Sequence, residues 1–298
     1  MNPSVRLLTF AAGCAAVFAA ALGVGHVVGP VGPVGSEPAE AAGHGMNGGE
    51  AGDEMAGMSH VDVGGLEASG NGYTLGLAQD RLDAGAQPLV FTISDAEGQP
   101  VTSYDEQHER DLHLIVVRRD LTGFQHVHPT LDRDSGAWRT SVDLTPGAWR
   151  VLADFRPSGA DPLVLGTDLL VGGAFAPEPL GPDQLEAHVD GFDVGLGGSL
   201  VAGEETVLTA TVLRDGRPVV DLEPYLGAYG HLVSLRDGDL AYVHVHPDEG
   251  SGPGPEIAFH TEFPGPGRYR LFLNFQHDGA VHTAVFTVTV ADGDGHDH

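Results

Sequence analysis

Residues 231–247 read His-Leu-Val-Ser-Leu-Arg-Asp-Gly-Asp-Leu-Ala-Tyr-Val-His-Val-His-Pro, and this stretch has the pattern of a β-hairpin. Apolar and polar residues alternate on both sides of Asp237-Gly238, a dipeptide that favours a two-residue hairpin turn. The sequence therefore predicts two antiparallel strands, with Arg236 and Asp239 flanking the turn.

Three histidines are brought together by this predicted hairpin. If Arg236 and Asp239 pair, His231 lies directly opposite His244, and opposed residues share one face of the sheet. His246 lies on the same face, because side chains alternate along a strand. We therefore expect the three imidazoles to converge on one patch.

The same spacing occurs earlier in the chain, in His113, His126 and His128. Its turn, Arg119-Asp120, is a weaker turn signal than Asp-Gly. A slip of one residue would move His113 to the opposite face. The register of this first copy is therefore predicted less sharply than that of the second.

The two hairpins belong to a longer internal repeat with a period of about 120 residues. The matching segments are residues 98–101 with 216–219, residues 113–129 with 231–247, and residues 146–150 with 266–270. A period of this length indicates a duplicated domain and excludes a solenoid.

Short alternating segments, broken by Gly, Pro and Asp, predict an all-β chain with two tandem immunoglobulin-like β-sandwiches. We place the first sandwich at residues 71–173 and the second at 185–292, joined by a Pro-rich connection at 174–184. The predicted strands are residues 73–78, 89–94, 112–118, 124–128, 138–144, 149–155 and 164–171, then 192–196, 205–213, 230–236, 241–246, 256–263, 269–275 and 283–290.

An uncharged apolar run at residues 7–28 follows Arg6 and is long enough for a membrane-spanning helix. The single positive charge before it places the N-terminus in the cytoplasm and the sandwiches outside. We read residues 1–28 as a signal anchor, with a cleaved signal peptide and a secreted protein as the alternative. Residues 29–70 have the composition of a disordered linker, and residues 293–298 form an acidic, His-containing tail.

Composition excludes several functional classes. The net charge of −28 argues against a nucleic-acid partner, because phosphates repel such a surface. The single cysteine, Cys14, lies in the apolar N-terminal run, so the sandwiches have no disulfide and no cysteine ligand for blue copper.

Three neutral imidazoles on one face are suitable ligands for Cu(II) or Zn(II). The sequence thus predicts two metal sites, with His277 and His282 as further candidate ligands of the second, and His108 just before the first. The linker adds thioether and imidazole groups that favour copper over zinc, at His44, Met46, Met55, Met58 and His60.

Four segments of the second half carry a family resemblance: residues 230–233 (Gly-His-Leu-Val), 244–247 (His-Val-His-Pro), 275–279 (Phe-Gln-His-Asp-Gly) and 282–284 (His-Thr-Ala). They resemble a group of largely uncharacterised secreted or membrane-anchored bacterial proteins, actinobacterial ones among them, with duplicated β-sandwich domains. Those domains are similar to extracytoplasmic copper-handling proteins of the CopC and YtkA type. The resemblance covers the second domain well and the first more loosely, and it implies a compartment, a fold and a metal theme.

Three functions compete on this basis. The first is an extracytoplasmic metal-binding protein that sequesters or delivers copper, with zinc as the alternative ion. The second is a non-catalytic structural or interaction module of the cell envelope without a metal; no protein partner is indicated. The third is a metalloenzyme with a three-histidine site, which we do not expect because no catalytic motif or positioned general base accompanies the histidines.

Overall fold

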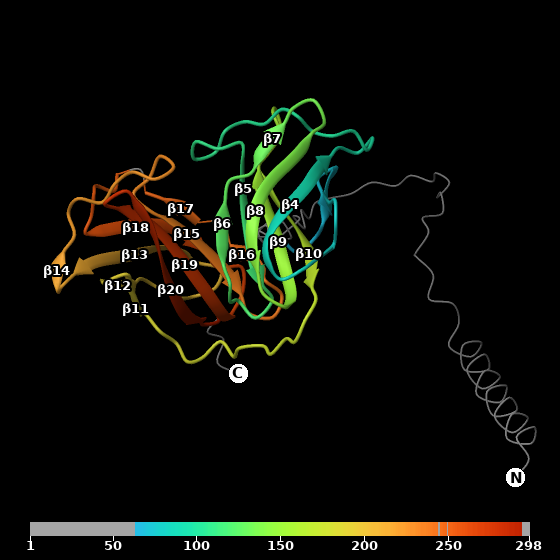
Figure 1. Ribbon diagram of the computed structural model, residues 1–298. Helices are drawn as coiled ribbons and strands as arrows, with labels where there is room; N and C mark the ends of the chain where they lie inside the picture. The colour runs from blue at the N-terminus through green and yellow to red at the C-terminus, as the bar shows by residue number, and fades with distance from the viewer. Residues whose placement is uncertain (1–62, 244, 249, 294–298) are drawn as a thin grey trace, which may run out of the picture. The chain divides into compact units, whose positions relative to one another are not determined.

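The computed structural model describes residues 63–243, 245–248 and 250–293, and their regular structure consists of β-strands (Figure 1). This confirms the all-β fold class with two sandwiches. The predicted anchor at residues 1–28, the linker up to residue 62 and residues 294–298 of the tail lie outside the described residues. Among the described residues, no helix has the length and apolar character needed to cross a membrane.

The first sandwich packs two five-stranded sheets against each other. Sheet 1 contains, in spatial order, β1 (Ser69–Gly70), β2 (Tyr73–Leu77), β4 (Gly85–Ser94), β8 (Ala137–Leu144) and β7 (Thr130–Asp132). Sheet 2 contains β3 (Arg81–Leu82), β10 (Leu163–Val171), β9 (Gly147–Phe155), β5 (Leu112–Arg118) and β6 (Gln125–Val127). The β3–β10 pair is parallel, and the other pairs are antiparallel.

The second sandwich repeats this plan. Sheet 3 contains β11 (Glu186–Val189), β12 (Phe192–Gly197), β13 (Glu205–Arg214), β18 (Glu256–Glu262) and β17 (Val245–Pro247), with β14 (Arg217–Pro218) beside β13. Sheet 4 contains β16 (Tyr242–Val243), β15 (His231–Arg236), β19 (Gly267–His277) and β20 (Ala280–Val290).

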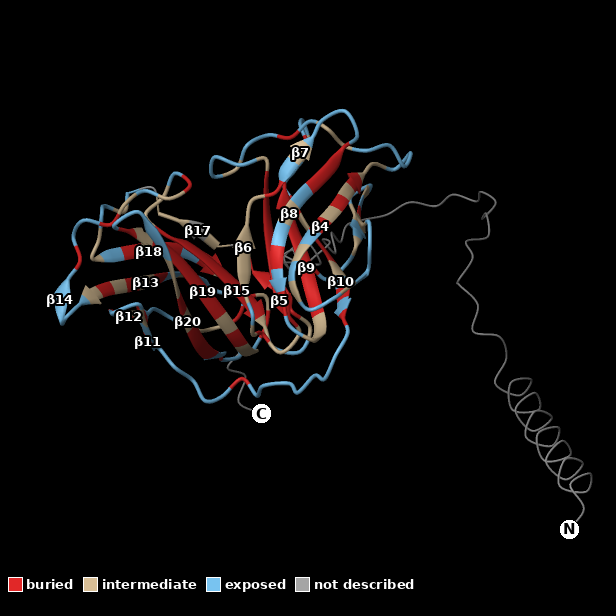
Figure 2. Cartoon of the chain, in the orientation of Figure 1, coloured by how far each residue is buried: buried red, intermediate tan, exposed pale blue. Residues whose placement is uncertain are grey.

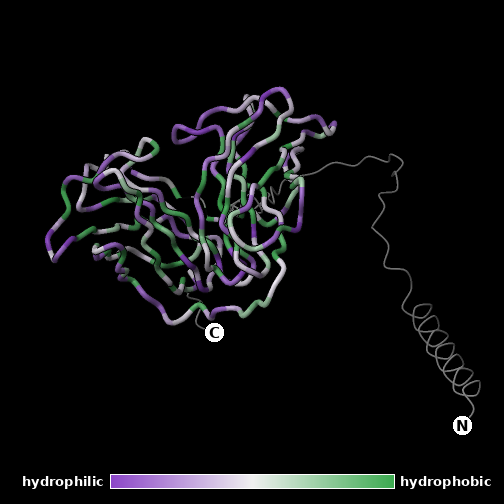
Figure 3. The backbone as a smooth tube through the Cα atoms, viewed as in Figure 1, coloured by the Kyte–Doolittle hydropathy of each residue, from purple (hydrophilic) through white to green (hydrophobic). Residues whose placement is uncertain are grey.

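Each sandwich has its own apolar core, because one face of every central strand points inward. Figure 2 shows buried residues along β5, β9, β15 and β19, and Figure 3 shows hydrophilic loops at the top of the view. Trp138 stacks on Phe91 in the first core, with ring centroids 6.2 Å apart. Trp149 and Tyr269 hold equivalent places and each donates to a backbone carbonyl four residues upstream, at 2.8 and 2.7 Å.

Strand β5 is buried on both faces. Its residues Leu114 and Val116 belong to the first core, whereas Ile115 and Val117 belong to a third apolar cluster, the interdomain cluster. That cluster joins the outer faces of sheets 2 and 4 and contains Ile115, Val117, Leu121, Leu152, Leu180, Val233, Leu235, Leu240, Tyr242 and Phe272. The near-continuous apolar run of β5 reflects this double burial.

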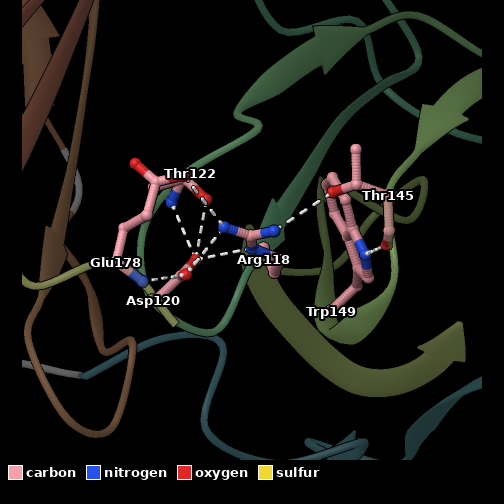
Figure 4. A network of polar contacts seen from close by, with 6 residues as sticks. All are labelled: Arg118, Asp120, Thr122, Thr145, Trp149 and Glu178. Atoms are coloured by element: carbon pink, nitrogen blue, oxygen red, sulfur yellow. Dashed lines mark hydrogen bonds and ion pairs between the residues drawn. The ribbon is translucent and has the colours of Figure 1, made fainter. Parts of the chain in front are cut away.

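The connection between the sandwiches is fastened to the first one by a polar network (Figure 4). Asp120 receives two hydrogen bonds from Arg118, at 2.9 and 2.8 Å, and one from the backbone N–H of Glu178, at 2.9 Å. Two residues further along, Leu180 is buried in the interdomain cluster. Asp183 then accepts from the backbone N–H and hydroxyl of Thr289 in the second sandwich.

Residues 64–70, which we expect in the linker, instead belong to the fold. Gly65 accepts hydrogen bonds from Arg150 through its carbonyl oxygen at 2.6 and 3.2 Å, and Gly64 accepts from the backbone N–H of Tyr242 at 3.0 Å. Gly65 has φ of 77°, and a Cβ there would lie 2.6 Å from the Leu152 side chain. This close approach accounts for the glycine.

The predicted two-residue turn of the second hairpin is wrong. The N–H of Arg236 donates to the carbonyl of Ala241 at 3.1 Å, which leaves four residues in the loop. The carboxylate of Asp239 closes this longer loop by binding Arg236 and the N–H of Ala241. Ser234 therefore pairs with Val243, two residues from the predicted register. A shift of two keeps every side chain on its expected face.

The predicted single strand at residues 241–246 is also wrong. Tyr242–Val243 pairs with β15 in sheet 4, but Val245–Pro247 pairs with β18 in sheet 3, where His246 lies opposite His260. The chain changes sheets between the two strands. The alternation of apolar and polar residues continues where the chain changes sheets. The pattern indicates which face of the strand a residue lies on, but not which strand is its neighbour.

Candidate metal centre

Strands β5 and β6 place the first histidine triad on the outer face of sheet 2. His126 lies opposite Ile115, so the two share a face, and His113 lies two residues before Ile115 on that same face. His128 follows His126 by two. The structure thus brings the predicted His113, His126 and His128 together, with His113 only 7% exposed and the other two half-buried.

The nitrogen atoms of the triad converge. Nδ1 of His113 lies 3.1 Å from Nε2 of His126 and 3.2 Å from Nε2 of His128. One ring nitrogen from each of the three residues lies within 4.8 Å of the other two. The ring centroids are 4.9 to 5.3 Å apart.

Two of these rings are held in one tautomer by their outer nitrogens. The carbonyl oxygen of Gln107 can only accept, so His113 donates its Nε2–H to it at 2.9 Å and keeps a lone pair on Nδ1. His126 donates its Nδ1–H to Oδ1 of Asn274 at 3.1 Å and keeps a lone pair on Nε2. The Asn274 amide is itself oriented by its donation to Thr283 Oγ1 at 2.8 Å.

A conflict follows from these tautomers. The lone pairs of His113 Nδ1 and His126 Nε2 face each other at 3.1 Å, with no proton of a neutral ring between them. An extra proton or another cation between the two nitrogens would remove this repulsion. Outer hydrogen bonds that turn imidazole lone pairs inward are the usual arrangement around metal-bound histidine.

Burial disfavours the extra proton. Desolvation lowers the pKa of His113, and together with its histidine neighbours it lowers the pKa of His126 well below the usual value. The pKa of His128 is lowered to about 3, first by burial and then by the charge of His113 and Arg110. The three rings are therefore neutral near pH 7, the state in which imidazole binds metals.

Two of the three nitrogen–nitrogen distances fit one small cation. Metal–nitrogen bonds to Zn²⁺ are about 2.0–2.1 Å long, so two nitrogens on one ion are separated by about 2.9 Å at a right angle and about 3.4 Å at a tetrahedral angle. The observed 3.1 and 3.2 Å fall between these values.

The second sandwich contributes residues that we did not expect at this site. His231, 6% exposed, places its ring centroid 6.4 Å from that of His113 and 6.3 Å from that of His126. Tyr225 contacts both His231 and His128. Asn274 lies opposite His231 and Asp154 lies opposite His113 in matching strand positions. Extending the match of residues 146–150 with 266–270 pairs Asp154 with Asn274, but the repeat contains no sign that the two faces meet.

His108 lies at the edge of the same site. It adopts φ of 48° in the loop before β5, and its ring centroid lies 5.3 Å from that of His231 and 6.0 Å from that of His113. Its side chain is exposed. The loop therefore adds an imidazole between the two sandwiches.

The remaining predicted ligands lie elsewhere or outside the described part. His244 and the side chain of His246 are not among the described groups, and neither are the linker residues at positions 44–60. His282 lies opposite Phe275, on the core side of sheet 4, and binds Asp190 at 2.8 Å. His277 lies on that same side, 3.3 Å from Asp221. The structure thus separates His277 and His282 from His231, because alternation puts them on the opposite face of sheet 4 from Asn274.

A family model matches residues 67–164 and matches again at residues 187–292. The chain belongs to the family described as Domain of unknown function (DUF8832). Each DUF8832 domain covers one sandwich, so the internal repeat is a repeat of this domain. The relationship to copper-handling proteins of the CopC and YtkA type stays a prediction. No curated protein matches the chain.

Several solved structures are similar to the pair of DUF8832 domains. The FdeC adhesin of Escherichia coli is 14% identical, with a TM-score of 0.24, over 74% of this chain and 65% of that one. A putative membrane-anchored protein from Corynebacterium diphtheriae is 11% identical, with a TM-score of 0.23, over 74% of this chain and 59% of that one. The chain spans less than two thirds of the length of either.

Proposed function

We propose that this chain is a non-catalytic binding module of the cell envelope, and that it binds a transition-metal ion through His113, His126 and His128. The ion is copper, with zinc as the alternative. The membrane anchor predicted from the N-terminal apolar run supports a position of the two sandwiches outside the cytoplasm.

One observation carries the proposal. The tautomers of His113 and His126 leave two lone pairs facing each other at 3.1 Å in a half-buried site. A cation bound between them and His128 removes this repulsion. Because the ligands are neutral and buried, they need not lose protons before the ion binds near pH 7.

The imidazole and thioether groups of the chain together favour copper. Three imidazoles are suitable ligands for Cu(II), Cu(I) and Zn(II). Of the two divalent ions, Cu(II) binds nitrogen ligands more tightly than Zn(II) does. Met46, Met55 and Met58 add thioethers, which suit Cu(I). This combination supports sequestration or delivery of copper.

The alternative is an envelope interaction module without a metal. It is favoured by the hydrogen bonds that attach the connection to both sandwiches, through Glu178 and Asp183. In that case the histidines only contribute to the interface between the sandwiches.

Metal titration of the purified full-length protein separates the two functions. We expect His128→Ala to weaken the tightest Cu(II) site at least about tenfold, since it removes one of three ligands. Within the described residues, the hydrogen bond of His128 goes to His113 of its own sandwich, so the fold should persist. His188→Ala, an exposed histidine paired with Asp193, is the matched control and should bind as the parent does. Equal binding by the parent and His128→Ala would leave only the interaction module.

A further inference from the structure

A cavity of about 40 Å³ lies between the two sandwiches and is lined by the first histidine of both copies. Its lining includes His108, His113, His126, Asp154, His231 and Tyr242. The sequence predicts two separate sites, one for each domain. The structure instead places His113 and His231 on the wall of one cavity, with ring centroids 6.4 Å apart.

The ring of His231 is held by the same kind of hydrogen bond as the ring of His113. It donates its Nε2–H to the carbonyl of Tyr225 at 2.7 Å, as His113 does to Gln107, six residues upstream in both cases. Its Nδ1 therefore keeps a lone pair.

We propose that the two copies form one dinuclear metal centre across the domain interface, with one ion on the first triad and a second ion on His231. This proposal rests on the proposed function of the triad. His108 lies beside His231 at the cavity edge and offers a further imidazole to that second ion.

Asp154 provides the charge that such a pair requires. Two divalent ions within a few ångströms repel each other, and carboxylates are the usual ligands that offset this repulsion in two-metal sites. Asp154 is 7% exposed, lines the cavity and accepts a hydrogen bond from Tyr242 at 3.0 Å. Its carboxylate thus lines the same cavity as His113 and His231.

Electron paramagnetic resonance during Cu(II) titration of the full-length protein tests the proposal. We expect the first equivalent to give the spectrum of an isolated ion. A second equivalent should then broaden that spectrum and add a half-field line, since two nearby unpaired electrons interact. In His231→Ala the half-field line should disappear while the first ion still binds.

A second variant distinguishes the loss of a ligand from a folding defect. His108 is exposed in a loop, so His108→Ala should leave the fold intact and weaken the second ion at least about tenfold, as loss of a ligand does. His188→Ala serves as the control and should keep the half-field line.

The outcomes distinguish a failure of the dinuclear centre from a failure of the proposed function. One bound ion that depends on His128, with no half-field line at any copper load, would overturn the dinuclear centre and leave the proposed function standing. Two ions with isolated spectra would overturn it as well. Binding that is unaffected by His128→Ala would overturn the proposed function itself.

Discussion

His126 of the first sandwich donates its Nδ1–H to Oδ1 of Asn274 of the second sandwich at 3.1 Å. This bond makes a ligand of the proposed metal centre depend on the docking of the other domain. It also decides which nitrogen of His126 faces His113. The site is therefore a property of the two sandwiches together.

Replacing Asn274 by alanine should weaken metal binding about 10- to 100-fold, because the outer hydrogen bond that orients a histidine ligand is lost. Asn274→Asp keeps an acceptor for His126 and should bind within a few-fold of the parent. Competitive titration with Cu(II) or Zn(II) measures both. If the alanine variant binds as tightly as the parent, Asn274 does not orient His126.

Tyr242→Phe should lower the free energy of unfolding by about 1–3 kcal/mol, because it leaves the buried Asp154 carboxylate without one of its donors. The ring remains in the interdomain cluster, so packing is retained. Urea unfolding of parent and variant measures the difference. In the double variant with Asp154→Asn the loss should be smaller than the sum of the two single losses.

Acid stability should depend on Asp120. Burial alone raises the pKa of its carboxyl, but hydrogen bonds from Arg118, the backbone of Glu178 and Thr122 outweigh it and bring the pKa to about 2, below the ordinary 3.8. A depressed carboxyl pKa stabilises the folded state above pH 3.8, and this contribution disappears as the pH falls towards 2.

Asp120→Asn should therefore lose less stability than the parent between about pH 4 and pH 2. Thermal unfolding at several pH values measures the two slopes, and Asp134→Asn, an exposed carboxylate in the first sandwich, is the control. Parallel slopes for the parent and Asp120→Asn would contradict the prediction.

Leu180→Ala should destabilise the protein by about 2–4 kcal/mol, because it opens a cavity in the interdomain cluster. Leu185 is the first residue of the second sandwich and is 46% exposed, and Leu185→Ala should change the stability by less than about 0.5 kcal/mol. Denaturant unfolding compares the two. Similar losses for both variants would show that the cluster does not hold the sandwiches together.

Most strands of the fold follow from local patterns. Residues 112–118 are predicted and observed with identical limits as β5, because the apolar run ends at charged residues on both sides. The short strands β1, β3, β7, β11 and β14 are absent from the prediction. They lie at sheet edges, where two to four residues carry too little alternation to be recognised.

The hairpin faces are predictable, but the loop is not. Asp237-Gly238 favours a two-residue turn by local conformation alone. Leu240 enters the interdomain cluster with 0% exposure, and its burial favours the longer loop. The register thus follows a contact that lies outside the hairpin.

The sequence by itself determined the duplication, the all-β class and the common face of His113, His126 and His128, because strand alternation is local and a repeat is visible in the residues. Only the tertiary structure decided that the outer faces of sheets 2 and 4 meet, bringing His231 and Asn274 to the first triad. That contact is made by apolar residues far apart in the sequence, such as Phe124 and Phe272, whose rings stack. Such residues look like ordinary strand residues until the two sheets pack together.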